Sequence, residues 1–364
     1  MIGIVHINTP GSSPYLKNYI DLLTAEGMPF ELIFWDRENE RESYPGVTSW
    51  MYSKPIPNGL SRVLKIRHFI GFSMYARKII RRRGYDKLIV MTTMTAQVLY
   101  SLLVKRYKNR FFLDIRDHTY EQYGIYRRRE VRIVAASWAT AISSEGFLSF
   151  LPPSGKYVLA HNLYADDLVK AEHFVPAVRQ LGQPVRIVFT GLMRALDIDQ
   201  YFLQKLGRDE RFELYFHGSA TNPGQYEQFC KDNGLDAVRF TGRYTFDQKP
   251  GLIAPAHLLY NYFDGIIMQH AMTNRYYDSL VFGIPTLSKA ATFCGKRVAD
   301  RGLGITLDLD DPNFSDNLYT AFTGFDHAAF NAARETELRL VLRQQEEYLE
   351  TIRCFIRIKD GSTL

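Results

Sequence analysis

The stretch from residue 272 to residue 288, MTNRYYDSLVFGIPTLS, carries the pattern that decides the fold. It begins as an amphipathic segment, stops at Gly283 and continues as a short apolar run. A helix, a glycine stop and a buried strand in this order are typical of an α/β domain with a parallel sheet. Asp278 lies one turn before the glycine. An acid on a helix is usually part of a solvated face, so any other role for Asp278 needs support from the rest of the chain.

Short apolar runs recur on both sides of one segment that lacks periodicity. These runs are rich in β-branched and aromatic residues, and helix-like stretches separate them. Before that segment the runs are 2–7, 30–35, 86–91, 110–115, 139–143 and 156–160. After it they are 185–191, 212–218, 237–242, 256–262, 284–288 and 304–309. We interpret 163–184 as a linker and 326–358 as one long helix. The pattern predicts an α/β protein with two doubly wound, Rossmann-like domains. We expect them at 1–165 and 166–340, with 341–364 as a helix that returns to the first domain.

The composition is that of an ordinary globular protein of two domains. The chain has 364 residues, of which 46% are hydrophobic and 23% charged. Its three cysteines show no paired spacing that would indicate a disulfide framework or a zinc site. The start, MIGIVHI, has no basic region of the kind that opens a signal peptide, and no apolar run is long enough to span a bilayer. We expect a cytoplasmic protein, at most peripherally bound to the inner membrane.

Positive charge is concentrated in the first half of the chain. Residues 1–170 contain 24 Lys and Arg against 15 acids, and residues 171–364 contain 21 against 24. The segment 60–83 interleaves apolar residues with eight Lys or Arg. It is either an amphipathic basic helix that lies on anionic lipid or a core helix with a solvated basic face. Nucleic acid is a poorer candidate partner for this basic segment, because the sequence contains no nucleic-acid recognition module.

Ligands of open α/β sheets bind beyond the carboxyl ends of the strands, so the residues that follow each apolar run are the candidates. After the first run, Gly11, Ser12 and Ser13 form a flexible turn before a helix that we expect to begin near Pro14. Backbone N–H groups there can hold an anion or sugar hydroxyls. A glycine-serine sequence before a helix more often forms a turn that binds no ligand.

Four ionisable residues lie at the end of the run 110–115, within the segment DIRDH (114–118). Asp114 and Arg116 alternate to one face, where an internal salt bridge is as good an interpretation as a functional one. Asp117 and His118 fall at the strand tip. Histidine titrates near neutrality and can exchange a proton or bind a sugar hydroxyl, which makes His118 a candidate catalytic residue together with Asp117.

In the second domain, glycines end three consecutive apolar runs: Gly191, Gly218 and Gly242. Arg194 follows the first closely and Arg243 follows the third. Glycine permits close approach of the backbone to a ligand, and arginine can clamp a diphosphate. The combination favours a nucleotide site.

Two Asp-x-Asp spacings could in principle hold a metal ion. They are Asp197–Asp199 and Asp308–Asp310. The first begins a predicted helix and the second runs into a turn before Pro312, so we favour capping acids for both. We predict no metal ion and no cofactor.

The order of these parts resembles that of GT-B glycosyltransferases, above all the retaining, glycogen-synthase-like group that includes enzymes of bacterial capsular and exopolysaccharide synthesis. The specific block is NRYYDSLVFGIPTLS (274–288) with GLGITLD (302–308). That group carries two glutamates with seven residues between them, the second five residues before Gly-x-Pro. Asp278 takes the second position, which the group uses to hold the ribose. His270 takes the first, where an acid is expected, so the resemblance gives no catalytic glutamate.

The resemblance also implies roles for other residues. Gly191, Arg194 and Arg275 are expected at the donor diphosphate, although the lysine that usually follows is Asp197 here, so Arg194 acts with Arg275 or Lys289. Asp278, His270 and Asn274 are expected at the ribose and the sugar, and Gly242, Arg243 and Tyr244 at the base. DIRDH occupies the place of a histidine segment that the group has near the transferred sugar. Gly11, Ser12 and Ser13 occupy the place of an acceptor-side loop. The two domains are expected to face each other across a cleft, the first on the acceptor side and the second binding the donor.

The sequence therefore predicts a metal-independent, retaining transfer from a nucleoside diphosphate sugar to a saccharide acceptor, expected to be lipid-linked, in bacterial surface polysaccharide synthesis. Two alternatives stay open. One is a two-domain sugar-binding protein without activity, and the other is a GT-B-like nucleotide-sugar epimerase or an inactive relative, which the departure at His270 allows.

Overall fold

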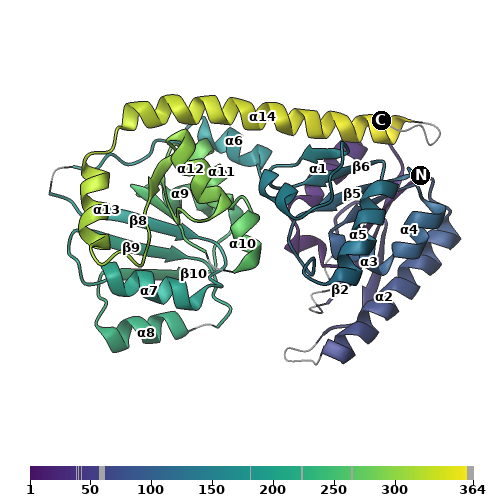
Figure 1. Cartoon of the computed structure of the whole chain (residues 1–364), viewed down its shortest axis with the longest axis horizontal. Coiled ribbons are helices and arrows are strands. Elements are labelled where there is room, and N and C mark those ends of the chain that lie inside the picture. Colours follow the sequence, from purple (N-terminus) through teal and green to yellow (C-terminus); the bar gives the residue numbers. More distant parts are fainter. Residues whose placement is uncertain are drawn as a thin grey trace. The chain divides into compact units, whose positions relative to one another are not determined.

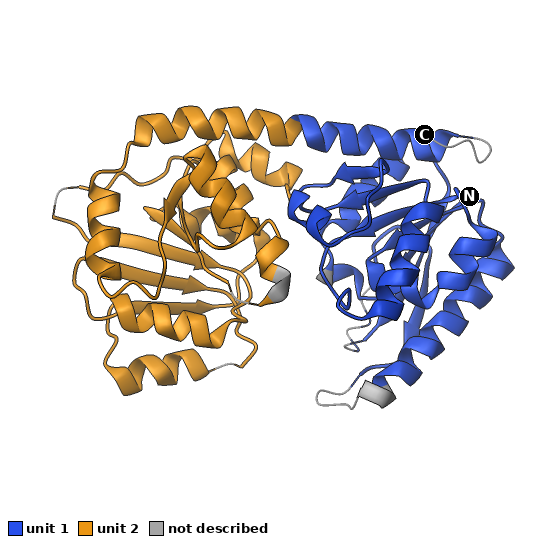
Figure 2. Cartoon of the chain, viewed as in Figure 1, with its two compact units in different colours: residues 1–161, 343–364 blue, residues 162–342 orange. Residues whose placement is uncertain are grey.

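The apolar runs of the first half form one parallel sheet in the computed structural model. The structure describes residues 1–37, 39, 41, 43–56, 62–180, 182–222, 224–263 and 265–358, with the side chains at 12, 62–64, 266 and 267 excepted. The chain divides into unit 1, residues 1–161 and 343–364, and unit 2, residues 162–342 (Figure 2). The expected boundaries were 165/166 and 340/341.

The sheet of unit 1 has the order β3-β2-β1-β4-β5-β6-β7, and all of its pairings are parallel. Its strands are β1 (Ile2–His6), β2 (Phe30–Asp36), β3 (Ser49–Ser53), β4 (Lys87–Met91), β5 (Phe111–Ile115), β6 (Ala139–Ile142) and β7 (Tyr157–Leu159). Six of them coincide with predicted runs. The seventh, β3, has the sequence SWMYS and contains no fully buried residue at the sheet edge, so it lacks the apolar signal that marks a buried strand.

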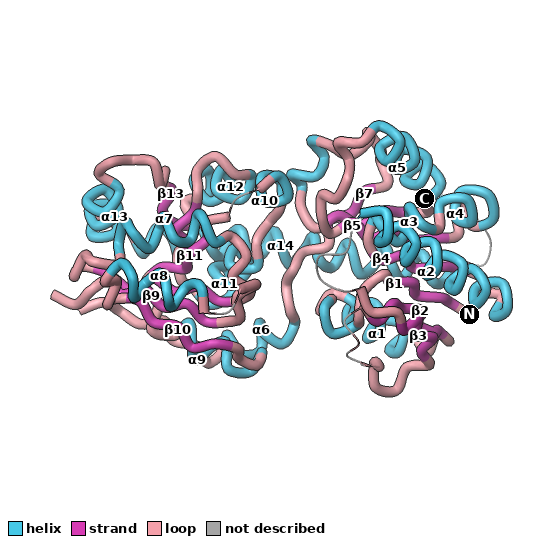
Figure 3. The backbone as a smooth tube through the Cα atoms, turned by 90° about the horizontal axis from the view of Figure 1, so that it is seen from below, coloured by secondary structure: helices cyan, strands magenta, loops and turns pink. Residues whose placement is uncertain are grey.

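Helices lie on both faces of this sheet (Figures 1 and 3). Side chains of α1 and of the end of α14 share one core with β1, β2 and β5, and α2 to α5 cover the other face. The helices are α1 (Leu16–Ala25), α2 (Arg62–Arg83), α3 (Thr93–Val98), α4 (Tyr100–Arg106), α5 (Gly124–Ala136) and α14 (His327–Arg357), with the 3-10 turns η1 (Pro10–Ser12) and η2 (Glu145–Ser149).

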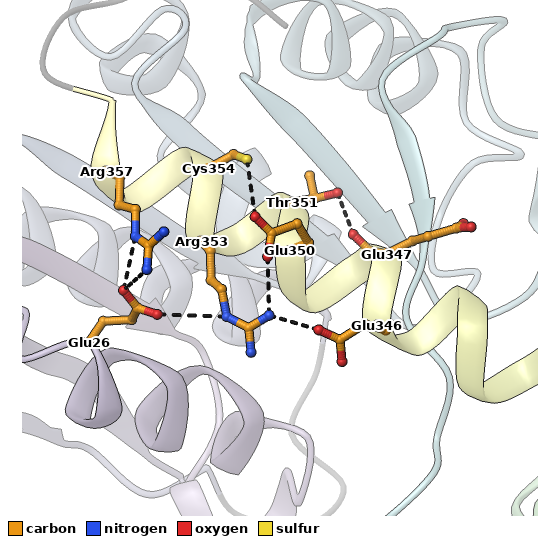
Figure 4. A network of polar contacts seen from close by, with 8 residues as sticks. All are labelled: Glu26, Glu346, Glu347, Glu350, Thr351, Arg353, Cys354 and Arg357. Atoms are coloured by element: carbon orange, nitrogen blue, oxygen red, sulfur yellow. Dashed lines mark hydrogen bonds and ion pairs between the residues drawn. The ribbon is translucent and has the colours of Figure 1, made fainter.

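The long C-terminal helix α14 is a single element whose last part belongs to unit 1. Tyr348, Ile352 and Phe355 are buried in that unit's core. The Lys87 ammonium group donates to carbonyls at the helix end, including that of Ile356 at 3.1 Å, which satisfies groups that every helix leaves without an internal partner. At the surface, Arg353 and Arg357 form ion pairs with Glu26 of α1's end (Figure 4). The expected helix 341–364 corresponds to the last part of α14.

The sheet of unit 2 has the order β10-β9-β8-β11-β12-β13, again all parallel. This is the doubly wound arrangement of Rossmann domains, with the order reversing between β8 and β11. The strands are β8 (Val185–Thr190), β9 (Phe212–His217), β10 (Val238–Gly242), β11 (Leu258–Asn261), β12 (Thr286–Ser288) and β13 (Gly304–Thr306). Each coincides with a predicted run.

Two cores flank the unit 2 sheet. One contains side chains of α7, α8 and α13, and the other contains side chains of α9, α11, α12 and the first part of α14. The helices are α6 (Ala165–Ala171), α7 (Leu196–Leu206), α8 (Gln225–Asn233), α9 (Lys249–Ile253), α10 (Ile266–His270), α11 (Asn274–Phe282), α12 (Phe293–Arg301) and α13 (Phe314–Thr323), with the 3-10 turn η3 (Phe246–Gln248). The interpretation of 163–184 as a plain linker was wrong for α6, which forms a helix with a buried acid.

Candidate active site

The carboxyl ends of β8 and β9 approach each other closely because glycine follows both strands. The N–H of Gly191 donates to the carbonyl of His217 at 2.9 Å, and the N–H of Gly218 donates to that of Gly242 at 2.8 Å. A Cβ on Gly218 would lie 1.7 Å from the carbonyl oxygen of Gly191, and both glycines have a φ above +120°. No other residue fits this arrangement.

Arg275 reaches this edge from the first turn of α11. Its guanidinium carbon lies 4.3 Å from the ring centre of Phe189 and 4.9 Å from that of Phe263. Its Nη2 is 3.0 Å from the position that a Cβ on Gly191 would take. The residue is 7% exposed, and its Nε has no hydrogen-bond partner among the described residues. Burial lowers the pKa of Arg275, yet an arginine keeps its charge at neutral pH, so the site holds a buried cation with an unused donor.

Asp278, one turn further along α11, is paired with a lysine that the sequence did not single out. Lys249 Nζ donates to Asp278 Oδ1 at 2.7 Å and to Asp167 Oδ2 at 2.6 Å, and all three side chains are buried. Burial opposes the charge on Lys249, but the two carboxylates raise its pKa above the ordinary value. Burial also raises the pKa of Asp167, whose Oδ1 finds no partner within the described chain. Asp278 Oδ1 is therefore occupied in this structure, and its other oxygen is the one available to a ligand.

Tyr244 belongs to the same group of residues. Burial raises its pKa, and Arg275, Asp278 and Lys249 are all near enough to act on its hydroxyl electrostatically. Arg194 is exposed and near enough to Arg275 for their like charges to interact. The structure thus brings together Gly191, Arg194, Arg275, Asp278 and Tyr244, which the sequence had assigned separately.

The other predicted donor-site residues lie at the margin of this group. Asn274 is exposed on the first turn of α11, next to Arg275. His270 is half-buried and ends α10. Gly242 and Arg243 are exposed after β10, and no hydrogen bond or ion pair within the described residues joins Arg243 to the group.

The two Asp-x-Asp pairs have different environments. Asp199 is buried and accepts hydrogen bonds from Tyr226 at 2.8 Å and Tyr260 at 2.7 Å; burial raises its pKa to about 6. It is a core acid, so the interpretation as a helix cap was wrong for this residue. Asp308 accepts a hydrogen bond from the backbone N–H of Asp310 at 3.2 Å in the turn before α13. Within the residues that the structure describes, no group of three or more His, Cys, Asp or Glu side chains could hold a metal ion.

In unit 1, the residues at the end of β5 include a buried ion pair and the candidate catalytic histidine. Arg116 and Asp114 form a buried two-pronged ion pair, with Nε–Oδ1 at 2.6 Å and Nη2–Oδ2 at 2.9 Å. Tyr19 donates to the same carboxylate at 2.6 Å, so this pair fixes the strand end. His118 is buried, packs against Phe150 and places Nδ1 3.5 Å from Glu121 Oε2.

The end of β1 contains a histidine that sequence reasoning missed. His6 Nε2 lies 2.6 Å from Ser13 Oγ, and burial lowers the pKa of His6 to about 4, so its ring is neutral at physiological pH. Gly11 is exposed within η1, which occupies Pro10–Ser12. The Ser12 side chain lies outside the described part, and α1 begins at Leu16. His6 escaped attention because it stands inside an apolar run, where a buried core histidine is the ordinary expectation.

Comparisons with known proteins give the fold. No protein-family model matches the chain, and no curated protein matches it in sequence. Among solved structures, the sucrose-phosphate synthase of Thermosynechococcus elongatus is similar with a TM-score of 0.68 and 11% identity over 98% of this chain and 96% of that one. HepE of Anabaena, solved with UDP and glucose, gives a TM-score of 0.64 and 12% identity over 96% and 99%. WaaG, a glycosyltransferase involved in lipopolysaccharide biosynthesis, gives a TM-score of 0.61 and 13% identity over 96% of this chain and 95% of that one. The chain has the GT-B fold.

The GT-B fold confirms the predicted fold class of two Rossmann-like domains. At 11–13% identity the likeness carries the fold alone. The ligand roles of Arg275, Asp278 and His118 stay predictions, as does the cleft between the domains. Among the described residues, no helix combines the length and the apolar character needed to cross a membrane.

Proposed function

We propose that this chain is a glycosyltransferase that moves a sugar from a nucleoside diphosphate sugar to a saccharide acceptor. The observation that carries the proposal is the buried Arg275 beside the backbone of Gly191, at the carboxyl end of β8. A buried cation whose Nε has no hydrogen-bond partner among the described residues suits a diphosphate, because guanidinium groups bind phosphate in forked geometry. HepE, which shares the fold, has been solved with UDP-glucose.

In this proposal the donor is held by three side chains of unit 2. Arg275 and Arg194 bind the diphosphate, and Asp278 accepts from the ribose hydroxyls through the oxygen that Lys249 leaves open. The anomeric carbon exchanges its bond to phosphate oxygen for a bond to the acceptor oxygen, and the acceptor proton leaves with the diphosphate. Arginine charge stabilises the departing group where negative charge develops, so the reaction needs no metal ion. The transfer retains the anomeric configuration.

The acceptor side of the proposal rests on unit 1. His118 and Asp117 lie at the tip of β5, where a histidine can bind or deprotonate a sugar hydroxyl. Gly11 and Ser13 line the loop after β1. The acceptor is a lipid-linked saccharide in the synthesis of a bacterial surface polysaccharide.

Helix α2 supports a peripheral contact with the membrane. Ile66, Ile70 and Met74 follow one another at helical spacing and are 55%, 54% and 68% exposed, and exposed basic residues flank them. Positions 60 and 61 of the predicted basic segment lie outside the described residues. Apolar side chains on a basic helix favour anionic lipid.

Vesicle sedimentation tests the membrane contact. We expect the full chain to sediment with anionic vesicles and not with neutral ones, and Ile70→Glu to abolish the binding. Val178→Glu, which changes an exposed valine of unit 2, is the control and should bind as the unchanged chain does. Equal binding by Ile70→Glu would remove α2 from the contact.

A transfer assay tests the activity. The full chain is incubated with labelled UDP-, GDP- and CMP-sugars and a bacterial lipid extract, and label is followed into the organic phase. We expect transfer from one donor, undiminished by EDTA. Arg275→Met, which keeps the volume between the two phenylalanine rings, should lower the rate by at least ~100-fold, as loss of a charge that stabilises the transition state does. Transfer by Arg275→Met at the unchanged rate contradicts the proposed site.

A further inference from the structure

Two buried residues of opposite charge on helix α11 lie close together but do not pair. Arg275 and Asp278 are three positions apart, a spacing at which opposite charges on a helix ordinarily attract each other. Burial lowers the pKa of Arg275, and the nearby carboxylate of Asp278 acts in the opposite direction. Yet no ion pair or hydrogen bond joins the two side chains within the described chain, where Arg275 Nε has no partner. Another cation holds the acid instead.

That cation is Lys249. Its Nζ donates to Asp278 Oδ1 at 2.7 Å and to Asp167 Oδ2 at 2.6 Å, and all three residues are 6% exposed or less. Hydrogen bonds in which both partners are charged are among the strong ones. Lys249 begins α9 and Asp167 belongs to α6, so the lysine connects the acid of α11 to two other helices of unit 2.

Three aromatic rings surround the ammonium group of Lys249. Its Nζ lies 4.8 Å from the ring centre of Phe246, 5.6 Å from that of Phe282 and 5.8 Å from that of Tyr164. The face of an aromatic ring attracts a cation, most strongly where water is excluded. The rings and the two acids therefore fix the position of the ammonium group from several sides.

We propose that Lys249 keeps the guanidinium group of Arg275 available to an anionic ligand, by binding the acid that would otherwise neutralise it. While Asp278 is bound to Lys249, Arg275 stays against the rings of Phe189 and Phe263 at the end of β8. Without Lys249, Asp278 would turn to Arg275, and the resulting ion pair would remove the positive charge from the site. Lys249 is a positioning residue, because it acts through Asp278.

The role of Arg275 as a diphosphate ligand belongs to the proposed function, so the effect of Lys249 on ligand binding rests on that function. The distribution of charge in the ligand-free chain does not. The test therefore combines a measurement without ligand and a measurement with inorganic pyrophosphate. Pyrophosphate has no ribose, so its binding reports on the arginine and not on a contact between Asp278 and a sugar hydroxyl.

The variants avoid leaving two buried acids without a cation. Lys249→Met alone would do so, and unpaired buried charges are strongly destabilising. Asp167→Asn is therefore the reference chain, and Lys249→Met is added to it, since the flexible methionine side chain suits an aromatic environment. Asp278→Asn is added last, as the rescue. Lys170→Met in the reference chain is the matched control, because Lys170 also belongs to α6's end of the cluster but pairs with the exposed Asp247.

NMR of the ligand-free chain measures the distribution of charge. The Nε–H signal of Arg275 is assigned by its loss in Arg275→Met. We expect this signal to shift when Lys249→Met is added to the reference chain, because the guanidinium group then donates to a carboxylate. Asp278→Asn should return the signal to its reference position, and Lys170→Met should not move it. A signal that Lys249→Met leaves in place, or one that stays shifted after Asp278→Asn, overturns the proposal.

Calorimetric titration with pyrophosphate measures the consequence for binding. Added to the reference chain, Lys249→Met should weaken binding at least ~10-fold, as loss of a charge-assisted contact does, and Asp278→Asn should restore it. A general structural defect would not be repaired by a second substitution, so weak binding that persists after Asp278→Asn contradicts the proposal, as does binding that Lys249→Met leaves unchanged. If the NMR signal behaves as expected but neither pyrophosphate nor any nucleotide binds, the role of Lys249 stands and the proposed function fails.

Discussion

The absence of a side chain at Gly191 allows the guanidinium group of Arg275 to lie at the end of β8. Its φ is +128°, and a Cβ there would come within 3.0 Å of Arg275 Nη2. Any side chain at this position strains the backbone and displaces the guanidinium group. The proposed donor site of unit 2 therefore depends on one glycine as much as on the arginine itself.

Gly191→Ala tests this dependence. We expect it to weaken nucleotide binding at least ~10-fold, since the bidentate contact of an arginine tolerates little displacement. Gly234→Ala is the matched control, because Gly234 also has a positive φ but has nothing within 4 Å of its potential Cβ. Both changes should lower the free energy of unfolding by about 1 kcal/mol through backbone strain, and only the first should change affinity in titration calorimetry. Unchanged affinity in Gly191→Ala contradicts this account of the site.

Among single residues, those at strand ends were predictable and those brought in by tertiary contacts were not. Gly191, Arg275 and Asp278 stand at or near recognisable strand and helix boundaries. Lys249 follows a 3-10 turn in an ordinary polar stretch, and only folding carries it to Asp278 and Asp167. No local sequence pattern predicts these pairings, because Asp278 and Asp167 are 29 and 82 residues away from Lys249 along the chain.

At the scale of elements, the end of α14 docks on unit 1 through two kinds of contact. The rings of Tyr348 and Phe355 are buried beside Phe112, at 6.4 Å and 5.8 Å between centres. The ion pairs of Arg353 and Arg357 with Glu26 lie at the surface (Figure 4). Buried aromatic area outweighs exposed ion pairs in free energy, so the rings should hold the helix.

Phe355→Ala and Glu26→Gln separate the two contributions. We expect Phe355→Ala to lower the free energy of unfolding of unit 1 by about 3–5 kcal/mol. Glu26→Gln should lower it by less than ~1 kcal/mol, because solvent and salt screen exposed pairs. Urea denaturation followed by tryptophan fluorescence measures both. A larger loss in Glu26→Gln than in Phe355→Ala would show that the surface network holds the helix.

The elements that sequence reasoning found are the strongly apolar and the strongly periodic ones. Buried parallel strands such as β4 and β8 appear as continuous apolar runs. The edge strand β3 and the seven-residue helix α6 escaped, because an exposed strand lacks such a run and a short helix offers too few turns to show a period.

At the scale of the whole molecule, two sheets with Rossmann strand order make the GT-B fold. The fold fixes which edge of each sheet carries ligands, and the side chains at that edge determine the chemistry. In unit 2 that edge holds a buried arginine, a lysine shared by two acids and glycine-lined backbone. We propose that this edge binds a nucleoside diphosphate without a metal ion.

Calorimetric titration of the full chain with UDP, GDP and CMP, in EDTA and again with magnesium, tests that claim most directly. We predict that one diphosphate binds equally well under both conditions, and that Arg275→Met weakens its binding at least ~10-fold, as loss of a buried charge-assisted contact requires. Absence of binding by every nucleotide, or binding that Arg275→Met leaves unchanged, would contradict it.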